Sequence, residues 1–263
     1  MTSRTAAGGL ESDDPSLVFD GASHEADGPL PELNEVIDPR SPHIRSHLAV
    51  GLSAAAAVGI VTIAVGARGG SLSGWDQAVH DWVILHRGPW DITLATVVTT
   101  GGITTLTLPG LAIVGAAALP GRPSLRARLG SAALLAGVGS VGVYAGLLLN
   151  GATGRERPTV ADWAGAAGGA SFPSGHTTAA TIFSLCCAWA LSARFVRHRS
   201  RRLLWVSAVV WALAVGWSRV WLGVHWPSDV VGGWLFATAW CAVAGAVVAY
   251  ARQRSAGSHA IPS

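Results

Sequence analysis

The apolar residues of this chain gather in long runs instead of being spread through the sequence as in a soluble protein. Each run is about 20 residues long, the length that crosses the roughly 30 Å hydrocarbon core of a bilayer as a helix. The runs fall at about 47–66, 92–118, 129–149, 175–193, 203–222 and 229–250. The pattern therefore predicts an all-α integral membrane bundle of six transmembrane helices.

The two ends of the chain differ from these runs. Residues 1–44 are acidic, contain several Pro, Gly and Ser residues and show no apolar period, which predicts a disordered tail. No charged start followed by an apolar stretch and a cleavage site is visible there, so the first run is expected to be an uncleaved anchor. We divide the chain into an acidic tail (1–44), a membrane domain (45–251) and a short second tail (252–263).

The composition agrees with one membrane domain, since half of the 263 residues are hydrophobic and 13% are charged. The three cysteines all lie in predicted spans, where they are expected to be small buried apolar residues. Gly101, Gly102 and Pro109 interrupt the second run. A membrane helix tolerates such residues where neighbouring helices satisfy the freed backbone groups, so the run is still predicted to be one span.

Clusters of arginine in the short loops predict the orientation of the bundle. They occur before the first span and after the second, fourth and sixth spans: Arg40, Arg45, Arg122, Arg126, Arg128, Arg194, Arg197, Arg199, Arg201, Arg202, Arg252 and Arg254. All of these loops fall on one side, which the positive-inside rule makes cytoplasmic. We therefore expect a multi-pass protein of the cell membrane with both termini in the cytoplasm and with segments 67–91, 150–174 and 219–228 outside.

Three further arginines, Arg155, Arg157 and Arg219, lie in the outer segments, where the orientation rule does not call for them. An arginine beside a helix end in a membrane protein usually has an anionic partner. In the structural alternative, the anionic partner of these arginines is a lipid headgroup, or Glu156 and Asp162, and not a bound substrate. A guanidinium binds two phosphate oxygens at once and stays charged, so these arginines suit a phosphate substrate.

The segment Pro173-Ser174-Gly175-His176 opens the fourth span. Serine before an apolar run is typical of a helix N-cap, and the free N–H groups of the first turn form an anion site. Gly175 would let a phosphate oxygen approach the backbone, and His176 would be near enough to donate a proton to a leaving oxygen. The alternative is a capped helix whose histidine faces water.

A second histidine, His225, lies just before the sixth span. Asp229 follows it by four residues, so its carboxylate could accept a hydrogen bond from one imidazole nitrogen and leave the other free to attack. The alternative is a structural His–Asp pair. We expect no metal and no cofactor, because the outer loops lack the cluster of carboxylates or histidines that holds two metal ions.

Together these segments resemble the type-2 phosphatidic acid phosphatase superfamily, whose signature is Lys-x6-Arg-Pro, Pro-Ser-Gly-His and Ser-Arg-x5-His-x3-Asp. The second motif is present as Pro173 to His176 and the third as Ser218, Arg219, His225 and Asp229. The resemblance covers roughly residues 45–251. It implies that His225 forms a phosphohistidine, that Asp229 orients it, and that His176 protonates the leaving group and then activates water.

The first motif departs from the family pattern. Arg157-Pro158 is present, but Asn150 occupies the position of the lysine. We expect Arg155 to supply the missing cation from a different angle. The resemblance then implies a phosphate site formed by Arg157, Ser174, Gly175 and Arg219, with Asn150 and Arg155 as further candidates.

The resemblance implies a membrane lipid phosphatase acting on a phosphatidic acid, phosphatidylglycerol phosphate or polyprenyl diphosphate. Its partners would be the lipid phosphate and the membrane, with no nucleic acid; the sequence does not predict the oligomeric state. A phosphotransferase that passes the group to an alcohol and a non-catalytic lipid-phosphate binder are the alternatives.

The outer segment 71–91 is predicted to be amphipathic and to lie among the lipid headgroups. Its apolar residues are Trp75, Val79, Trp82, Val83 and Leu85, with Trp90 as a further interfacial ring. Anchoring the fold and guiding lipid entry are both open as its role, and His80 and His86 match no motif.

Overall fold

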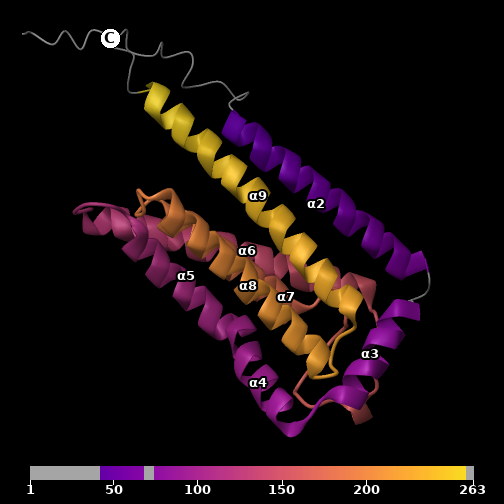
Figure 1. Ribbon diagram of the computed structural model, residues 1–263. Coiled ribbons are helices and arrows are strands. Elements are labelled where there is room, and N and C mark those ends of the chain that lie inside the picture. The colour runs from indigo at the N-terminus through magenta and orange to yellow at the C-terminus, as the bar shows by residue number, and fades with distance from the viewer. Residues whose placement is uncertain (1–41, 68–73, 259–263) are drawn as a thin grey trace, which may run out of the picture.

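The computed structural model describes residues 42–67 and 74–258, and within these ranges the chain is helical and has no strand (Figure 1). The helices are α2 (Pro42–Ala67), α3 (Gly74–His86), α4 (Pro89–Thr99), α5 (Thr104–Ala118), α6 (Leu125–Thr153), α7 (Gly175–Ser192), α8 (His198–Trp221) and α9 (Pro227–Ser258), with short 3-10 turns η1 (Thr100–Gly102) and η2 (Val160–Asp162). The all-α prediction is confirmed. Residues 1–41 of the expected acidic tail lie outside the described residues.

Several helices are long and apolar enough to cross a bilayer. Within the described ranges α6, α8 and α9 as far as Arg252 meet this test, and α4 and α5 form a fourth span if the bent pair counts as one. The apolar part of α2, Leu48–Ile63, is shorter, and α7 has 18 residues. The count of six spans stays a prediction.

Large apolar side chains cover the outward faces of the helices. Leu52 and Ile60 of α2, Ile113 of α5, Leu147 of α6 and Val247 of α9 are all exposed. A contiguous apolar surface of this kind is unfavourable in water and suits contact with lipid chains. The bundle is therefore built to be surrounded by a bilayer.

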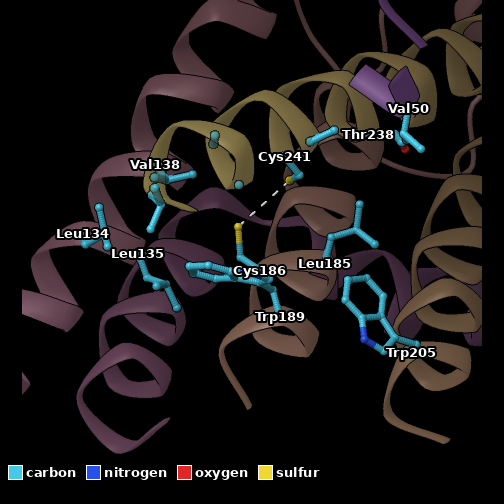
Figure 2. Close-up of a pocket in the computed structure, with 14 residues that line it drawn as sticks. Val50, Leu134, Leu135, Val138, Leu185, Cys186, Trp189, Trp205, Thr238 and Cys241 are labelled. Carbon is cyan, nitrogen blue, oxygen red and sulfur yellow. Dashed lines mark hydrogen bonds between the residues drawn. The ribbon is translucent and has the colours of Figure 1, made fainter. Parts of the chain in front are cut away.

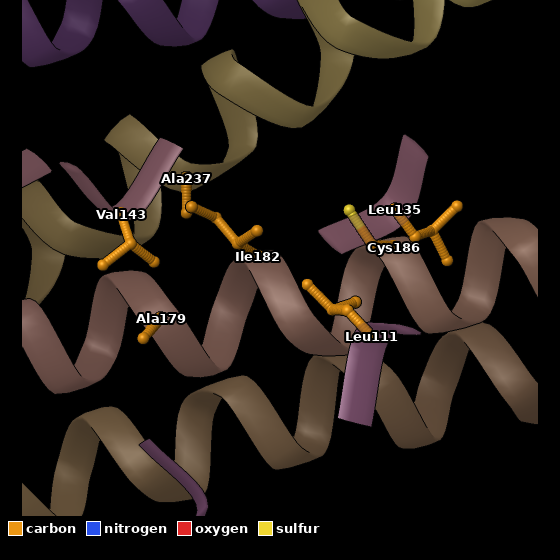
Figure 3. Packing of buried hydrophobic residues seen from close by; sticks show 7 residues of the cluster. All are labelled: Leu111, Leu135, Val143, Ala179, Ile182, Cys186 and Ala237. Carbon is orange, nitrogen blue, oxygen red and sulfur yellow. The ribbon is translucent and has the colours of Figure 1, made fainter. Parts of the chain in front are cut away.

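Helix α7 lies at the centre of the bundle and packs against α5, α6, α8 and α9. Its Ile182 is fully buried in an apolar cluster (Figure 3) to which α5 contributes Leu111, α6 Leu135 and α9 Ala237. Small residues permit this close packing; a Cβ on Gly142 of α6 would lie 2.5 Å from Trp240 Nε1. The central position of α7 fixes its N-terminus, which carries the Pro-Ser-Gly-His segment.

The loops between the helices separate into two ends. Helix α2 lies along α9, and its first residue is beside the C-terminal end of α9 (Figure 1). The α5–α6 and α7–α8 connections lie at this same end, which we call the arginine-rich end because it carries the clusters of arginine. The α6–α7 and α8–α9 connections lie at the opposite end, with α3. This second end is the site end.

The predicted second span is broken in the structure. Helices α4 and α5 meet at η1 with a bend of 53°, while Pro109 stays inside α5. Gly102 of η1 lies against the start of α7, where a Cβ would be 2.7 Å from the carbonyl oxygen of His176. The break therefore lets this backbone approach the site end of α7 closely.

Candidate active site

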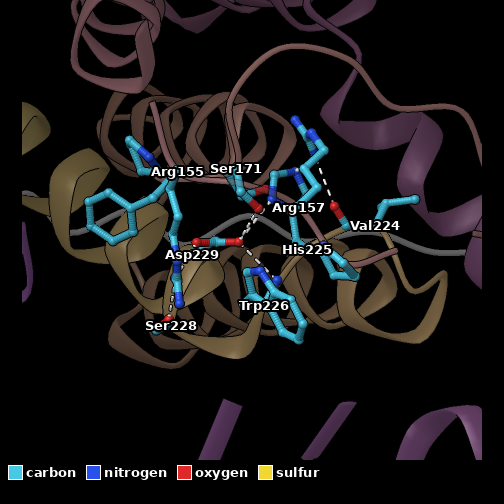
Figure 4. A network of polar contacts seen from close by, with 12 residues as sticks. Arg155, Arg157, Ser171, Val224, His225, Trp226, Ser228 and Asp229 are labelled. Carbon is cyan, nitrogen blue, oxygen red and sulfur yellow. Dashed lines mark hydrogen bonds and ion pairs between the residues drawn. The ribbon is translucent and has the colours of Figure 1, made fainter. Parts of the chain in front are cut away.

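The three sequence segments singled out above meet at the site end (Figure 4). The α6–α7 loop brings Arg157, the short α8–α9 connection brings His225, and the first turn of α9 brings Asp229. Ser174, Gly175 and His176 begin α7, and Arg219 lies in the last turn of α8. Residues from five parts of the chain thus converge on one site.

His225 lies between a carboxylate and a guanidinium. Its Nδ1 is 3.5 Å from Asp229 Oδ2, and its Nε2 is 2.9 Å from Arg157 Nη1. A guanidinium can only donate, so Nε2 must be the acceptor and the ring proton of the neutral imidazole lies on Nδ1, toward the carboxylate. This tautomer leaves a lone pair on Nε2, on the side of the ring away from the carboxylate.

The environment of His225 keeps the imidazole neutral. Burial lowers the pKa of His225 from its ordinary value of 6.5 to about 4, although the contact with Asp229 opposes this shift. The positive charges of Arg157 and Arg219 lower the pKa of the same ring further. Near neutral pH the ring is therefore unprotonated, as a nucleophile must be.

The carboxylate of Asp229 is held by several donors. Its Oδ2 accepts from the backbone N–H of Trp226 at 2.8 Å and from the hydroxyl of Ser171, and its Oδ1 accepts from Arg155 Nη1 at 2.6 Å. Asp229 itself is fully buried. A buried carboxylate with these fixed donors keeps one orientation, and the position of the imidazole follows from it.

Arg155 does not lie where we expected it. Its guanidinium is 2% exposed and bridges two buried carboxylates, with Nη1 on Asp229 and Nη2 2.8 Å from Asp76 Oδ2. Nη1 also donates to Ser228 Oγ at 2.6 Å. A buried cation is stabilised by such paired carboxylates, which explains why it turns away from the position expected for a phosphate ligand.

Asp76 of α3 was missed by the sequence analysis. Its carboxylate accepts from Ser228 N at 2.9 Å and from Ser228 Oγ at 2.7 Å, and it pairs with Arg155. The polar face of α3 thus packs onto the start of α9, while Trp75 and Trp82 point outward and are exposed. The amphipathic prediction for this segment did not foresee that a carboxylate would lie on the buried face.

Asn150, in the last turn of α6, holds the α6–α7 loop. Its Nδ2 donates to the carbonyl oxygens of Ala170 at 2.9 Å and Pro173 at 3.1 Å. Thr153 supports the same loop through the carbonyl oxygen of Phe172. The amide donors of Asn150 are therefore already engaged with backbone oxygens next to the Pro-Ser-Gly-His segment.

The start of α7 offers free backbone donors. Ser174 is the N-cap; its N–H donates to the carbonyl oxygen of Asp229 at 3.0 Å, and its hydroxyl accepts from Thr177 Oγ1 at 2.9 Å. Gly175 is exposed, and a Cβ there would meet nothing within 4 Å. First-turn amides have no acceptor inside the helix, so they can bind an anion in this open space.

His176 and the two remaining arginines border the same space. His176 is half-buried and lies within electrostatic range of His225, Arg157 and Arg219. The guanidinium of Arg157 donates to the carbonyl oxygens of Gly168, Gly169 and Ala170, and Arg219 donates to Thr99 Oγ1 at 2.9 Å. Thr99 ends α4 and is another partner that the sequence did not indicate. The arrangement combines a neutral imidazole, a second imidazole, two cations and free amides.

The described part of the chain holds no group of three or more His, Cys, Asp or Glu side chains that could bind a metal ion. His80 forms a separate pair with Asp162, 3.1 Å apart, and its ring lies against Trp226. This contact joins α3 to the α6–α7 loop.

Comparison with known proteins identifies the family. The model of the PAP2 superfamily matches residues 129–253. Phosphatidylglycerophosphatase B of Bacillus subtilis is 30% identical over 164 residues, which cover 60% of this chain and 75% of that protein. The chain belongs to the PAP2 superfamily. The resemblance given by the three sequence motifs is thus confirmed.

Other PAP2 relatives match over shorter stretches. The undecaprenyl-diphosphatase of Sulfolobus acidocaldarius is 36% identical over 70 residues, covering 25% of this chain and 27% of that protein. The chain spans about a quarter to a half of the length of several other curated relatives, which are likewise named as lipid phosphatases.

A solved structure shares the fold of this PAP2 protein. It is described as the crystal structure of the first transmembrane PAP2 type phosphatidylglycerolphosphate phosphatase from Bacillus subtilis. The TM-score is 0.61 at 23% identity, and the match covers 80% of this chain and 97% of that chain. The helical arrangement described above is therefore that of a transmembrane PAP2 protein.

Proposed function

We propose that this protein is a membrane lipid phosphatase that works through a phosphohistidine on His225. The observation that carries the proposal is the position of this neutral imidazole between Asp229 and Arg157, with Nε2 as its lone-pair nitrogen. The names of the PAP2 relatives support the same class of activity.

In the first step Nε2 of His225 attacks phosphorus and the bond to the leaving oxygen breaks, while His176 donates a proton to that oxygen. The pKa of His176 is about 4 in the free protein, so this role requires that the anionic phosphate of the bound substrate raises it. In the second step His176 takes a proton from water, the water oxygen attacks phosphorus, and the N–P bond breaks to release inorganic phosphate. Arg157 Nη1, which contacts Nε2 in the free protein, passes to a phosphate oxygen when substrate binds. Stabilising the charge on those oxygens is expected to be the largest catalytic contribution.

Arg157, Arg219 and the amides at Ser174 and Gly175 form the proposed phosphate site. For Arg155 we propose a positioning role instead of the expected phosphate contact, because its guanidinium is paired with the buried carboxylates of Asp76 and Asp229. The partners of Arg157 are neutral carbonyl oxygens and the imidazole, which an anionic phosphate can replace. Asn150 is proposed to shape the α6–α7 loop in a similar indirect way.

A lipid substrate is supported by a groove beside Arg219. The groove has a volume of about 270 Å³ and runs between Leu94 and Val98 of α4 and Ala214, Trp217 and Trp221 of α8. Its walls are largely apolar, so an acyl or prenyl chain fits here while the phosphate reaches the arginines. Phosphatidic acid, phosphatidylglycerol phosphate and polyprenyl diphosphate all have the required chain and reacting group.

The proposed membrane arrangement is six spans, with α2, α7 and the bent pair α4–α5 crossing together with the three helices that are long and apolar enough. Both termini are then cytoplasmic, and the site is extracytoplasmic. The concentration of arginine at the opposite end supports this orientation.

The proposal is tested by phosphate release from these three lipids with purified protein and a chelator present. We expect His225→Ala to lower kcat by at least about a thousandfold, since the nucleophile is lost. His86→Ala, which removes an exposed histidine of α3, is the matched control and should leave kcat unchanged. Equal activity of His225→Ala and wild type would overturn the mechanism, and strong inhibition by the chelator would contradict metal independence.

Reactions with radiolabelled substrate, quenched in alkaline detergent because acid hydrolyses a phosphohistidine, separate the alternatives. Labelled protein should accumulate in His176→Ala and be absent from His225→Ala. A product in which the phosphoryl group is joined to added alcohol would make the protein a transferase. If the wild-type protein binds lipid but acquires no label and releases no phosphate, it is a non-catalytic lipid-phosphate binder.

A further inference from the structure

Two adjoining cavities lie toward the arginine-rich end, away from the active site. The first, of about 170 Å³, lies between α2, α6, α7, α8 and α9 and is shown in Figure 2. The second, of about 630 Å³, opens beside the α5–α6 and α7–α8 connections. Both are lined by Leu134, Leu135, Trp189 and Trp205, so the two cavities adjoin at these side chains, and together they are called the space below.

The two cavities have different walls. The inner one is apolar, with Leu185, Cys186 and Cys241 among its lining residues. The outer one has the guanidinium groups of Arg201 and Arg252 on its wall. The space therefore changes from basic at its mouth to apolar at its inner end, the pattern that one phospholipid with a negative headgroup would match.

The basic mouth is built by contacts between helices. The guanidinium carbon of Arg252 lies 5.4 Å from the centre of the Trp189 ring, a cation–π contact between α9 and α7. Arg194 donates to the carbonyl oxygen of Leu119, another residue of the mouth, at 3.2 Å. These contacts hold the arginine side chains at the edge of the apolar space.

The charges of the described chain point to an anionic occupant. Its acidic residues all lie at or near the site end: Asp76, Asp81, Asp91, Glu156, Asp162 and Asp229. No carboxylate in residues 42–67 and 74–258 is therefore placed to pair with Arg201 or Arg252. Arg201 and Arg252 are both exposed, so an anion from outside this part of the chain can reach them.

We propose that this space binds one anionic glycerophospholipid, with its phosphate at Arg201 and Arg252 and an acyl chain in the inner cavity. Under the orientation proposed above, this lipid comes from the cytoplasmic leaflet, and its site is separate from the catalytic phosphate site. The proposal does not depend on the phosphatase activity.

The test measures lipids retained by the detergent-purified full-length protein after incubation with an equal mixture of phosphatidylglycerol and phosphatidylcholine, using native mass spectrometry. We expect one phosphatidylglycerol per chain, and retention about tenfold lower in Arg201→Gln/Arg252→Gln. Arg126→Gln/Arg128→Gln removes the same charge from the same end outside the cavity and should retain lipid as wild type does.

The acyl-chain part is tested separately by filling the inner cavity. Ala244 lines it, and Ala244→Phe should reduce retention, whereas Val247→Phe on the outward face of α9 should not. An equal loss of lipid retention in both arginine double variants would show that retention depends only on the positive charge of this end, and this would overturn the proposed site. Retention that appears only after removal of residues 1–41 would overturn it too, since the acidic tail would then be the occupant. A circular dichroism melt of each variant confirms that a loss is not due to unfolding.

Discussion

The imidazole of His225 combines almost complete burial with a position between opposite charges. Burial disfavours the protonated ring more strongly than the nearby carboxylate favours it, so the pKa falls to about 4. If His225 is the nucleophile, as proposed, no proton has to be removed from it at neutral pH. The remaining chemistry is then mainly the stabilisation of charge on phosphate.

The first prediction concerns the acid limb of the pH–rate profile. The neutral ring is the reactive form, so kcat/KM should fall as pH drops through about 4, not through 6.5. Arg157→Gln removes a positive charge that lowers this pKa, so the acid limb should move to higher pH. Phosphate release is measured with a monophosphate and a diphosphate lipid, which allows the titration of the substrate to be subtracted. A wild-type limb near 6.5 that Arg157→Gln leaves in place would contradict the assignment.

The second prediction concerns Arg155. Arg155→Ala removes the buried guanidinium that pairs with both Asp76 and Asp229 and should destabilise the protein by roughly 3–5 kcal/mol. The thermal midpoint in detergent is compared with that of Arg126→Ala, an exposed arginine whose loss should be nearly neutral.

Kinetic measurements distinguish whether Arg155 positions Asp229 or binds phosphate. Arg155→Lys keeps the buried charge and is expected to fold, with a lower kcat because Asp229 is held less precisely and with KM and phosphate inhibition little changed. If Arg155→Lys instead weakens phosphate inhibition and leaves kcat intact, Arg155 binds phosphate as the sequence first indicated.

Among the elements, the break between α4 and α5 has a direct effect on the site. Gly102 lies so close to His176 that a Cβ would be 2.7 Å from its carbonyl oxygen. The start of α7 is fixed by the packing of that helix, so an added methyl group must displace η1 or the histidine.

The third prediction follows from this contact. Gly102→Ala should cost about 1–3 kcal/mol of stability and lower kcat, because it shifts the backbone next to the general acid. Gly137→Ala in α6 is the control, since a Cβ there meets nothing within 4 Å and should change stability by no more than about 1 kcal/mol. Thermal unfolding and phosphate release are measured on both; equal behaviour of the two variants would show that the contact is unimportant.

The fourth prediction concerns the groove between α4 and α8. Ala214→Phe places a large ring in it and should raise KM several-fold for long-chain lipids, with little effect on a short-chain, water-soluble phosphate ester. Leu213→Phe, on the exposed face of α8, is the matched control. A similar rise in KM for both substrates would place the lipid chain elsewhere.

At the scale of the whole molecule, the fifth prediction tests orientation. Val160 in the α6–α7 loop and Val196 in the α7–α8 connection are both strongly exposed, at opposite ends of the bundle. A membrane-impermeant maleimide added to intact cells should label Val160→Cys and not Val196→Cys, with the wild-type protein reporting any reaction of the native cysteines. The reverse pattern would place the site in the cytoplasm.

Much of this arrangement could be read from the sequence, because hydrophobic runs and short motifs are local signals. The apolar runs predicted most helices closely, and the residues around His176 and His225 were predicted to face the same end. The direction of Arg155 could not be predicted, since it depends on Asp76, which lies 79 residues away in the chain. The break at η1 was not predicted either, because the sequence does not show whether Gly101, Gly102 or Pro109 interrupts the helix or is tolerated within it.

The bridge formed by Asp76, Arg155 and Asp229 has a consequence for how this protein can vary. One buried guanidinium pairs with both buried carboxylates, so a change at Arg155 removes a shared partner from two positions at once. Substitutions are expected to be accepted mainly in combination, and the three positions should covary among relatives. Helix α3, which carries Asp76, would then change in evolution together with the segments that carry Arg155 and Asp229, and could not be replaced by an unrelated amphipathic helix.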